Sequence, residues 1–285
     1  MKIMIKTELE RAFKSWGFWI TLIIGIGISV SQIVTRIIPA AINPISFFEP
    51  DNATVMPASA FQMWLGNGVT FEYTLYVRLI PILAAMPYAV TYLSDIKSGI
   101  IKNYISRTAK INYLVAKYMA VFITGGIVII LPLFLNYLTA IAVLPSFVWP
   151  TGVFSVFASG MWSGLFYTNP HIYVIMYMIL LFICGGLMST VVLIVSNLVN
   201  NRFVAVLAPY IIAEFANAVL RMADTDWIRK LSPAVLFNMS NINNILSYIV
   251  YITFLLILGG LVYFLGGLKH EISVSYTHLT LPTKR

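Results

Sequence analysis

The sequence predicts an all-α integral membrane protein, and three observations support this fold class. The chain has 285 residues, of which 60% are hydrophobic and only 10% are charged, whereas soluble domains contain about 25% charged residues. Its apolar runs are long enough to form helices that cross a bilayer. Its cations gather at the ends of those runs, the pattern that orients multi-pass proteins. The net charge of +8 therefore indicates membrane boundaries and anionic lipid rather than nucleic acid.

Six transmembrane helices are expected, with both termini in the cytoplasm. Most of the cations fall in the leader, in residues 95–117 and just after the last apolar run. The positive-inside rule places these segments inside the cell. The expected spans cover residues 17–34, 74–93, 114–138, 171–199, 205–220 and 245–267.

Residues 1–16 precede the first span and have the pattern of an amphipathic helix. Their apolar positions fall on one helical face, opposite several lysines: Ile5, Leu9, Ala12, Phe13 and Trp16. This pattern predicts an interfacial helix that lies flat on the membrane; the alternative is an ordinary charged leader. Because no small-residue cleavage site follows the apolar run, we expect the first span to be retained.

The segments expected outside the cell differ from the leader in composition. Residues 37–73 and 139–170 contain neither Lys nor Arg and are rich in aromatic residues, which predicts external loops that rest in the headgroup region. Residues 221–244 are polar with short apolar patches. We expect two short external or half-inserted helices there.

Residues 95–117 form the longest polar, basic run of the chain. Apolar side chains recur in it at the spacing of one helical face: Ile96, Ile100, Ile101, Tyr104 and Ile105. A short amphipathic cytoplasmic helix is therefore expected between the second and third spans. We expect Ser98 to cap its N-terminus and Thr108 to cap the helix that follows. The alternative is a solvated loop whose charges only set the orientation of the chain.

Motifs for catalysis and metal binding are missing from the sequence. The three histidines are scattered, no His-Glu-x-x-His pair occurs, and no Cys/His cluster has the spacing of a metal site. The phosphate-binding pattern Gly-x-x-x-x-Gly-Lys-Ser/Thr does not occur either. The single cysteine, Cys184, is interpreted as a packing residue. We expect no enzymatic activity, catalytic residue, metal or cofactor on this chain.

Glu214 is the one acid deep inside an expected span. An ionisable group in a membrane is costly and usually faces a cavity or a partner. Glu214 is therefore a candidate for the translocation path, with Arg78 as a possible pairing partner. The alternative is a structural position near the outer mouth of the span or at a helix break.

The order of elements and one motif are similar to a known family. A basic leader, a span, a long loop and a second span are followed by Asp95-x-x-Ser98-Gly99-x-x-Lys102, then Ser106-Arg107, then Tyr113-x-x-x-Lys117. This arrangement resembles the permease subunit of type-2 ABC transporters, in particular the bacterial export and peptide-resistance permeases. The likeness in topology covers residues 1–272 as a single transmembrane domain, whereas the motif covers only 95–117.

The resemblance implies that this chain works with a separate ATPase. In that family the loop between the second and third spans contains the coupling helix, which docks on the ATPase subunit. The residues thereby assigned to the docking interface are Asp95, Ser98, Gly99, Lys102 and Arg107. The apolar ridge of Ile100, Ile101, Tyr104 and Ile105 is expected to join them in contacting the partner surface.

Partners, location and function follow from the same resemblance. It implies an ABC ATPase that binds ATP and Mg, a second permease subunit in a homo- or heterodimer, and the bacterial plasma membrane. The expected function is export of an amphipathic or apolar cargo, such as an antimicrobial peptide or a drug.

Two other functions are kept as alternatives, a secondary transporter and a non-transporting membrane sensor or scaffold. A membrane-embedded enzyme would need His, Asp or Glu in several spans, and the sequence does not provide them. Residues 274–285 resemble a sequencing-adapter end translated in frame, so we expect them to be non-native and leave them out of functional reasoning.

Overall fold

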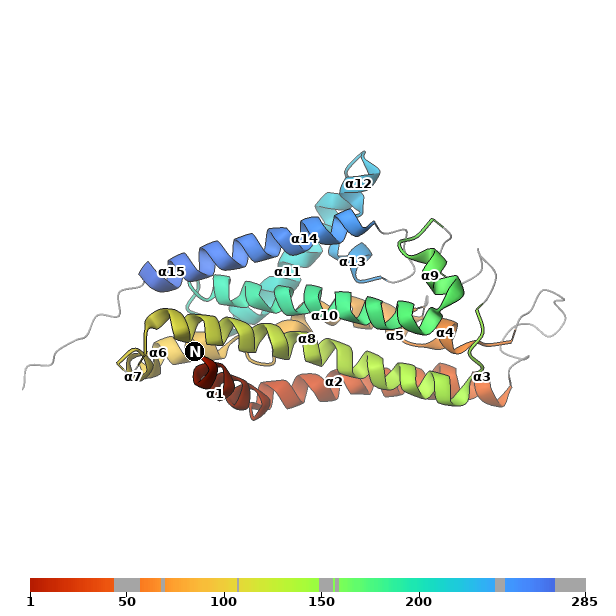
Figure 1. Ribbon diagram of the computed structural model, residues 1–285, viewed down its shortest axis with the longest axis horizontal. Helices are drawn as coiled ribbons and strands as arrows, with labels where there is room; N and C mark the ends of the chain where they lie inside the picture. The colour runs from red at the N-terminus through yellow and green to blue at the C-terminus, as the bar shows by residue number, and fades with distance from the viewer. Residues whose placement is uncertain are drawn as a thin grey trace, which may run out of the picture.

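The computed structural model describes residues 1–43, 57–67, 70–106, 108–148, 156, 159–238 and 244–269. All regular elements within these ranges are helices, most of them packed side by side as an elongated bundle (Figure 1). Five helical stretches of the described part are long and apolar enough to cross a membrane: Trp16–Ile42, Lys110–Val143, Pro170–Val195, Arg202–Arg221 and Ile245–Leu268. The chain therefore has the all-α architecture of a multi-pass membrane protein. The suspected tail, 274–285, lies outside the described residues.

The first and last of these stretches each contain a widened turn. Helix α2 (Trp16–Gln32) continues through the π-helical turn η1 (Ile33–Ile37) into α3 (Ile38–Ile42). The π turn directly precedes Pro39, and such local adjustments satisfy backbone groups that a proline frees. At the other end of the chain, α14 (Ile245–Leu258) passes through η2 (Gly259–Tyr263) into α15 (Phe264–Lys269).

The expected second span, 74–93, is not one continuous helix, and this prediction needs correction. Helix α5 (Phe71–Ala85) ends before the turn 86–90, and α6 (Thr91–Lys97) follows. The break contains Pro87, which has no N–H to donate to a helical ladder. The start of α2 packs closely here, since a Cβ atom on Gly17 would lie 2.7 Å from the Met86 carbonyl oxygen. The hydroxyl of Ser15 also donates to the Pro87 carbonyl at 2.8 Å.

Helices α8 (Lys110–Val143) and α10 (Pro170–Val195) pack against each other in the centre of the bundle. Small residues allow their close approach. A Cβ atom on Gly125 would lie 2.5 Å from the Ser189 Cβ, and one on Gly186 would lie 2.7 Å from the Phe122 carbonyl oxygen. Such contacts between small residues are typical of helices that associate in membranes.

The expected external loop 37–73 is partly wrong, because residues 57–67 pack inside the protein. This segment includes α4 (Ala60–Met63), and Trp64 has no exposed surface. The buried side-chain amides of Asn136 and Gln32 form hydrogen bonds with the backbone of this segment. The Leu65 N–H donates to Asn136 Oδ1 at 2.7 Å, and Gln32 donates to the Met63 carbonyl while accepting from Asn136. Polar backbone can be buried only when it finds such partners.

Residues 221–238 contain the two short helices expected from the sequence. Helix α11 (Arg202–Arg221) is followed by α12 (Asp226–Arg229) and α13 (Pro233–Leu236). Asn217 of α11 holds this region, because its Oδ1 accepts from the Ser232 hydroxyl at 2.7 Å and from the Ala234 N–H at 2.9 Å. The remaining short helices are α1 (Lys2–Phe13), α7 (Ile100–Ile105) and α9 (Ser163–Thr168).

Candidate functional site

The candidate site lies at one end of the bundle, where α1, α6, α7 and the first turns of α8 meet (Figure 1). Helix α7 follows α6 after a two-residue turn. The turn requires Gly99, whose φ of 72° lies in the left-handed region that favours glycine. The helix therefore turns sharply out of α6 before the chain enters α8.

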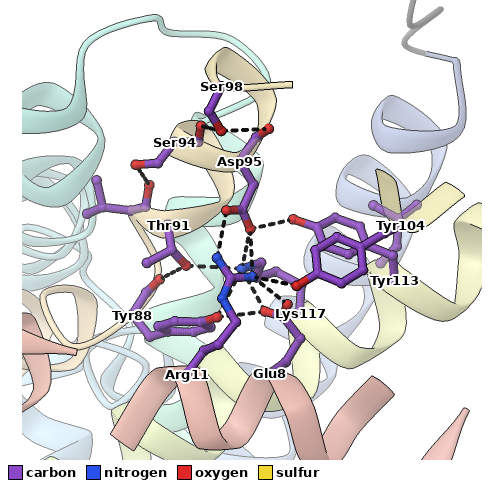
Figure 2. A network of polar contacts seen from close by, with 12 residues as sticks. Glu8, Arg11, Tyr88, Thr91, Ser94, Asp95, Ser98, Tyr104, Tyr113 and Lys117 are labelled. Atoms are coloured by element: carbon purple, nitrogen blue, oxygen red, sulfur yellow. Dashed lines mark hydrogen bonds and ion pairs between the residues drawn. The ribbon is translucent and has the colours of Figure 1, made fainter. Parts of the chain in front are cut away.

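Three buried charges and one partly exposed charge join three of these elements. The Lys117 ammonium of α8 has no exposed surface and lies 2.7 Å from Glu8 Oε2 and 2.7 Å from Asp95 Oδ2. The Arg11 guanidinium of α1 lies 2.8 Å from Glu8 Oε1 and 2.9 Å from Asp95 Oδ1. Two acids and two bases thus alternate around a closed ring (Figure 2). We call Glu8, Arg11, Asp95 and Lys117 the charge cluster.

Hydroxyl groups complete the hydrogen bonding of the charge cluster. The Tyr88 hydroxyl donates to Glu8 Oε2 at 2.7 Å, and the Tyr113 hydroxyl donates to Asp95 Oδ2 at 2.8 Å. The Lys117 ammonium donates to Thr91 Oγ1 at 3.1 Å. A buried ion pair is tolerated only when its charges are matched and its remaining lone pairs and protons are bonded. The charge cluster meets both conditions (Figure 2).

The contacts within the charge cluster shift the pKa values of Asp95 and Arg11 in the directions that keep these two groups charged. Burial alone would raise the pKa of the Asp95 carboxyl, but the Lys117 charge and the Arg11 hydrogen bond outweigh burial and hold that pKa below its ordinary value of 3.8. Burial would likewise lower the pKa of Arg11, but its hydrogen bond to Asp95 and the Glu8 charge hold the pKa above the ordinary value. Asp95 is therefore a carboxylate, and Arg11 a cation, throughout the physiological pH range.

The sequence assigned Asp95 to a docking surface, but the structure places it inside the protein. Its exposed fraction is 2%, and both carboxylate oxygens bond to groups of this same chain. Lys117, which the sequence treats only as the last cation of the motif, is its buried counter-ion. Asp95 consequently acts behind α7, as an anchor between α6 and α8.

The expected helix caps are also wrong. The Ser98 hydroxyl donates to the Ser94 carbonyl at 2.8 Å and closes the end of α6, while Gly99 occupies the N-cap of α7. Thr108 bonds back to the Tyr104 carbonyl at 3.3 Å, and Ala109 is the N-cap of α8. A left-handed glycine starts α7 without a capping side chain.

The apolar ridge expected on α7 is divided between two faces. Ile101 is buried, and the Tyr104 ring stacks on Tyr113 with 5.5 Å between centroids. Ile100 is 37% exposed, and Lys102 is exposed at a different position around the helix. Arg107 lies outside the described residues. The exposed side chains of α7 therefore include the apolar Ile100 and the basic Lys102.

Two lysines fasten this region to the ends of other helices. Lys97 donates to the Asn200 carbonyl between α10 and α11, and Lys110 donates to the Leu268 carbonyl of α15 at 3.1 Å. Cations bind well near the carbonyl ends of helices. The region around α7 is thus tied to α10 and α15 as well as to α1 and α8.

Sequence reasoning did not identify Glu8 and Arg11. It described the leader by an apolar face that rests on the membrane and includes Ile5 and Leu9, and did not expect the face with Met4, Glu8 and Ala12 to be buried in the protein. The signal was the four-residue spacing of these three positions, which aligns an acid with an apolar stripe. The expectation that Trp16 belongs to the apolar face of the leader is wrong, since Trp16 begins α2 and is 83% exposed.

No ion pair between described residues joins the two expected translocation-path residues. Glu214 is half-buried on α11 and Arg78 is exposed on α5. Among the described residues, no group of three or more His, Cys, Asp or Glu side chains is arranged to hold a metal ion.

Comparison with known proteins adds no relative: no protein-family model matches the chain, and no curated protein matches it significantly.

Proposed function

We propose that this chain is the permease subunit of a type-2 ABC transporter and that α7 docks on a separate ATP-hydrolysing subunit. The observation that carries the proposal is the combination of α7 and the charge cluster. A short helix with Ile100 and Lys102 outward stands at one end of the bundle. Directly behind it, matched buried charges join α6 to α1 and to the long helix α8.

This arrangement suits the transmission of force. Removing one partner of a buried ion pair costs about 3–5 kcal/mol, so α1, α6 and α8 resist separation. A displacement of α7 by a partner would move these helices together, as packed elements do in rigid-body transitions. Helix α8 packs along α10, so the motion would reach the centre of the bundle.

The proposal includes export of an amphipathic or apolar cargo across a bacterial plasma membrane by two such subunits. The cargo class rests on the resemblance to export permeases, and the charge pairs among the described residues at the α7 end are consistent with a path that has no free buried charge there.

A secondary transporter is the second candidate, favoured by the break between α5 and α6 at residues 86–90. Discontinuous helices are common at the substrate and ion sites of such proteins. The ion pairing of the charge cluster weighs against this candidate, because its carboxylates are already neutralised by Lys117 and Arg11.

The test is recovery of an ATPase with the affinity-tagged chain from membranes of its native host. Ile100→Asp places a charge on the outward face of α7, and Ile42→Asp, at an exposed position at the end of α3, is the matched control. We expect an ABC ATPase to accompany the wild type and Ile42→Asp but to be lost with Ile100→Asp at equal membrane levels. The proposal would be contradicted if the ATPase accompanied Ile100→Asp as well as the wild type. It would also be contradicted if no ATPase accompanied any of the three proteins.

A further inference from the structure

The outward face of α1 carries a groove that the charge cluster does not use. It has a volume of about 450 Å³ and is lined by Lys2, Ile5, Lys6, Leu9, Glu10 and Phe13. The apolar side chains Ile5, Leu9 and Phe13 run along it, and two lysines stand towards the N-terminal end. We call it the α1 groove.

We propose that the α1 groove binds one anionic phospholipid. Lys2 and Lys6 would hold the phosphate, and an acyl chain would lie against Ile5, Leu9 and Phe13. This inference does not depend on the proposed transport function, because it requires only that the chain spans a membrane.

The position of α1 supports a lipid as the occupant. Helix α1 ends at Phe13, and the apolar stretch Trp16–Ile42 begins three residues later. Trp16 and Trp19 are 83% and 52% exposed at that corner, and the Trp19 indole N–H donates to the Phe13 carbonyl at 3.0 Å. Exposed tryptophans at the start of a span mark the membrane–water interface, so the groove lies at headgroup level.

The charges on α1 select the sign of the headgroup. Arg11 and Glu8 turn inward and neutralise each other within the charge cluster. The outward side of the leader has three exposed lysines and one exposed acid: Lys2, Lys6, Lys14 and Glu10. The Lys6–Glu10 pair, at 3.9 Å with both side chains exposed, is a weak one. A helix with excess cations beside apolar side chains favours anionic over zwitterionic lipid.

Occupancy of the groove would also reach the charge cluster. The α1 groove and the charge cluster lie on two sides of one helix. Lys6 and Leu9 line the groove, while Glu8, between them in sequence, is buried on the other side. A lipid that holds α1 at the interface would therefore favour the pairing of Glu8 and Arg11 with Lys117 and Asp95.

The experiment is quenching of tryptophan fluorescence by brominated lipids around the full chain in nanodiscs. The probes are brominated phosphatidylglycerol and brominated phosphatidylcholine, titrated in parallel. We expect the wild type to favour the anionic lipid and Lys2→Gln/Lys6→Gln to reduce that preference about thirtyfold. Loss of the signal in Trp16→Phe/Trp19→Phe would assign it to this corner. The matched control Arg221→Gln/Lys230→Gln removes two cations far from α1 and is expected to keep the preference.

Three results would overturn the inference. Equal quenching of the wild type by both lipids would remove the selectivity. An unchanged preference in Lys2→Gln/Lys6→Gln would move the site away from the groove. Competition by soluble glycerol phosphate as effective as that of the lipid would show a phosphate site that makes no use of Ile5, Leu9 and Phe13. Because Lys2 and Lys6 are exposed, folding of the double variant is expected to be unchanged.

Discussion

Lys117 connects the two carboxylates of the charge cluster from a position with no contact to water. A buried lysine is stable there because Glu8, Asp95, Thr91 and Tyr88 all lie within hydrogen-bond distance of its ammonium group. Its place in the sequence, one turn past Tyr113, is predictable as a basic residue near a membrane boundary. The pairing with Glu8 is not, since it depends on how α1 folds back against α8.

Lys117→Met is expected to destabilise the protein by about 3 kcal/mol or more, because it leaves two buried carboxylates facing one guanidinium. Adding Glu8→Gln restores the balance of charge, and we expect the double variant Lys117→Met/Glu8→Gln to regain part of the loss. Thermal unfolding in detergent measures the stability of the single and the double variant. A double variant no more stable than the single one would show that charge matching does not govern this region.

Asp95 predicts the response to acid. Because its pKa is held below 3.8 in the folded protein, its contribution to stability is full above the unfolded-state value and is lost as the pH falls through the lower folded value. The melting temperature of the wild type should therefore fall steeply below about pH 4, and less steeply in Asp95→Asn. Asp226→Asn, at an exposed site, serves as the control and should follow the wild type. If the melting temperatures of the wild type and Asp95→Asn fell equally steeply at acid pH, the low pKa of Asp95 would not contribute to stability as proposed.

At the scale of elements, α7 depends on the left-handed turn at Gly99. A Cβ atom there would meet no other atom within 4 Å, so the cost of a side chain comes from the backbone alone. Gly99→Ala should cost about 1–2 kcal/mol, and Gly99→Asn less, since asparagine tolerates this conformation. Faster hydrogen exchange of the amides of residues 100–105 would report the loss. Gly27→Ala, at an open helical position, should not weaken α7; equal exchange in all variants would contradict the argument.

The buried segment 57–67 depends on Asn136 of α8. In Asn136→Leu the Leu65 N–H and the side-chain oxygen Oε1 of Gln32 lose their partner, and each unpaired buried group costs about 1–3 kcal/mol. We expect proteolysis and hydrogen exchange in 57–67 to increase. Thr139→Val, on an exposed position of the same helix, is the control. Unchanged protection of 57–67 in Asn136→Leu would show that apolar packing alone holds the segment.

The long apolar helices were predictable, but the elements between them were not. Hydropathy locates α8 and α10 because lipid requires continuous apolar helices. Hydropathy joined α5 to α6 because a proline such as Pro87 does not by itself end a span: Pro132 lies inside the continuous helix α8. It placed 57–67 outside because Trp64 and its neighbours have interfacial composition; their burial depends on amides supplied by distant Gln32 and Asn136.

At the scale of the whole molecule, the structure separates two ends. Helices α1, α6, α7 and α15 lie at one end of the bundle, and α3, α4 and α9 lie at the other (Figure 1). The first end contains the charge cluster together with Lys97, Lys102 and Lys110. The sequence predicts the basic leader and residues 95–117 on one side of the membrane, but it does not predict that their charges pair. The division of α7 into a buried face with Ile101 and an outward face with Ile100 required the structure, since both residues fit one apolar ridge in sequence.

The central claim is that the outward face of α7 contacts an ATP-hydrolysing partner, and site-specific photo-cross-linking tests it most directly. A benzophenone side chain is introduced at Asn103, exposed on α7, and as a control at Thr225, exposed beside α12 and distant from α7 along the bundle. After irradiation of host cells, we predict a covalent adduct at position 103, identified by mass spectrometry as an ABC ATPase, and none at position 225. Lipid adducts alone at position 103, or the same ATPase adduct from both positions, would contradict the account.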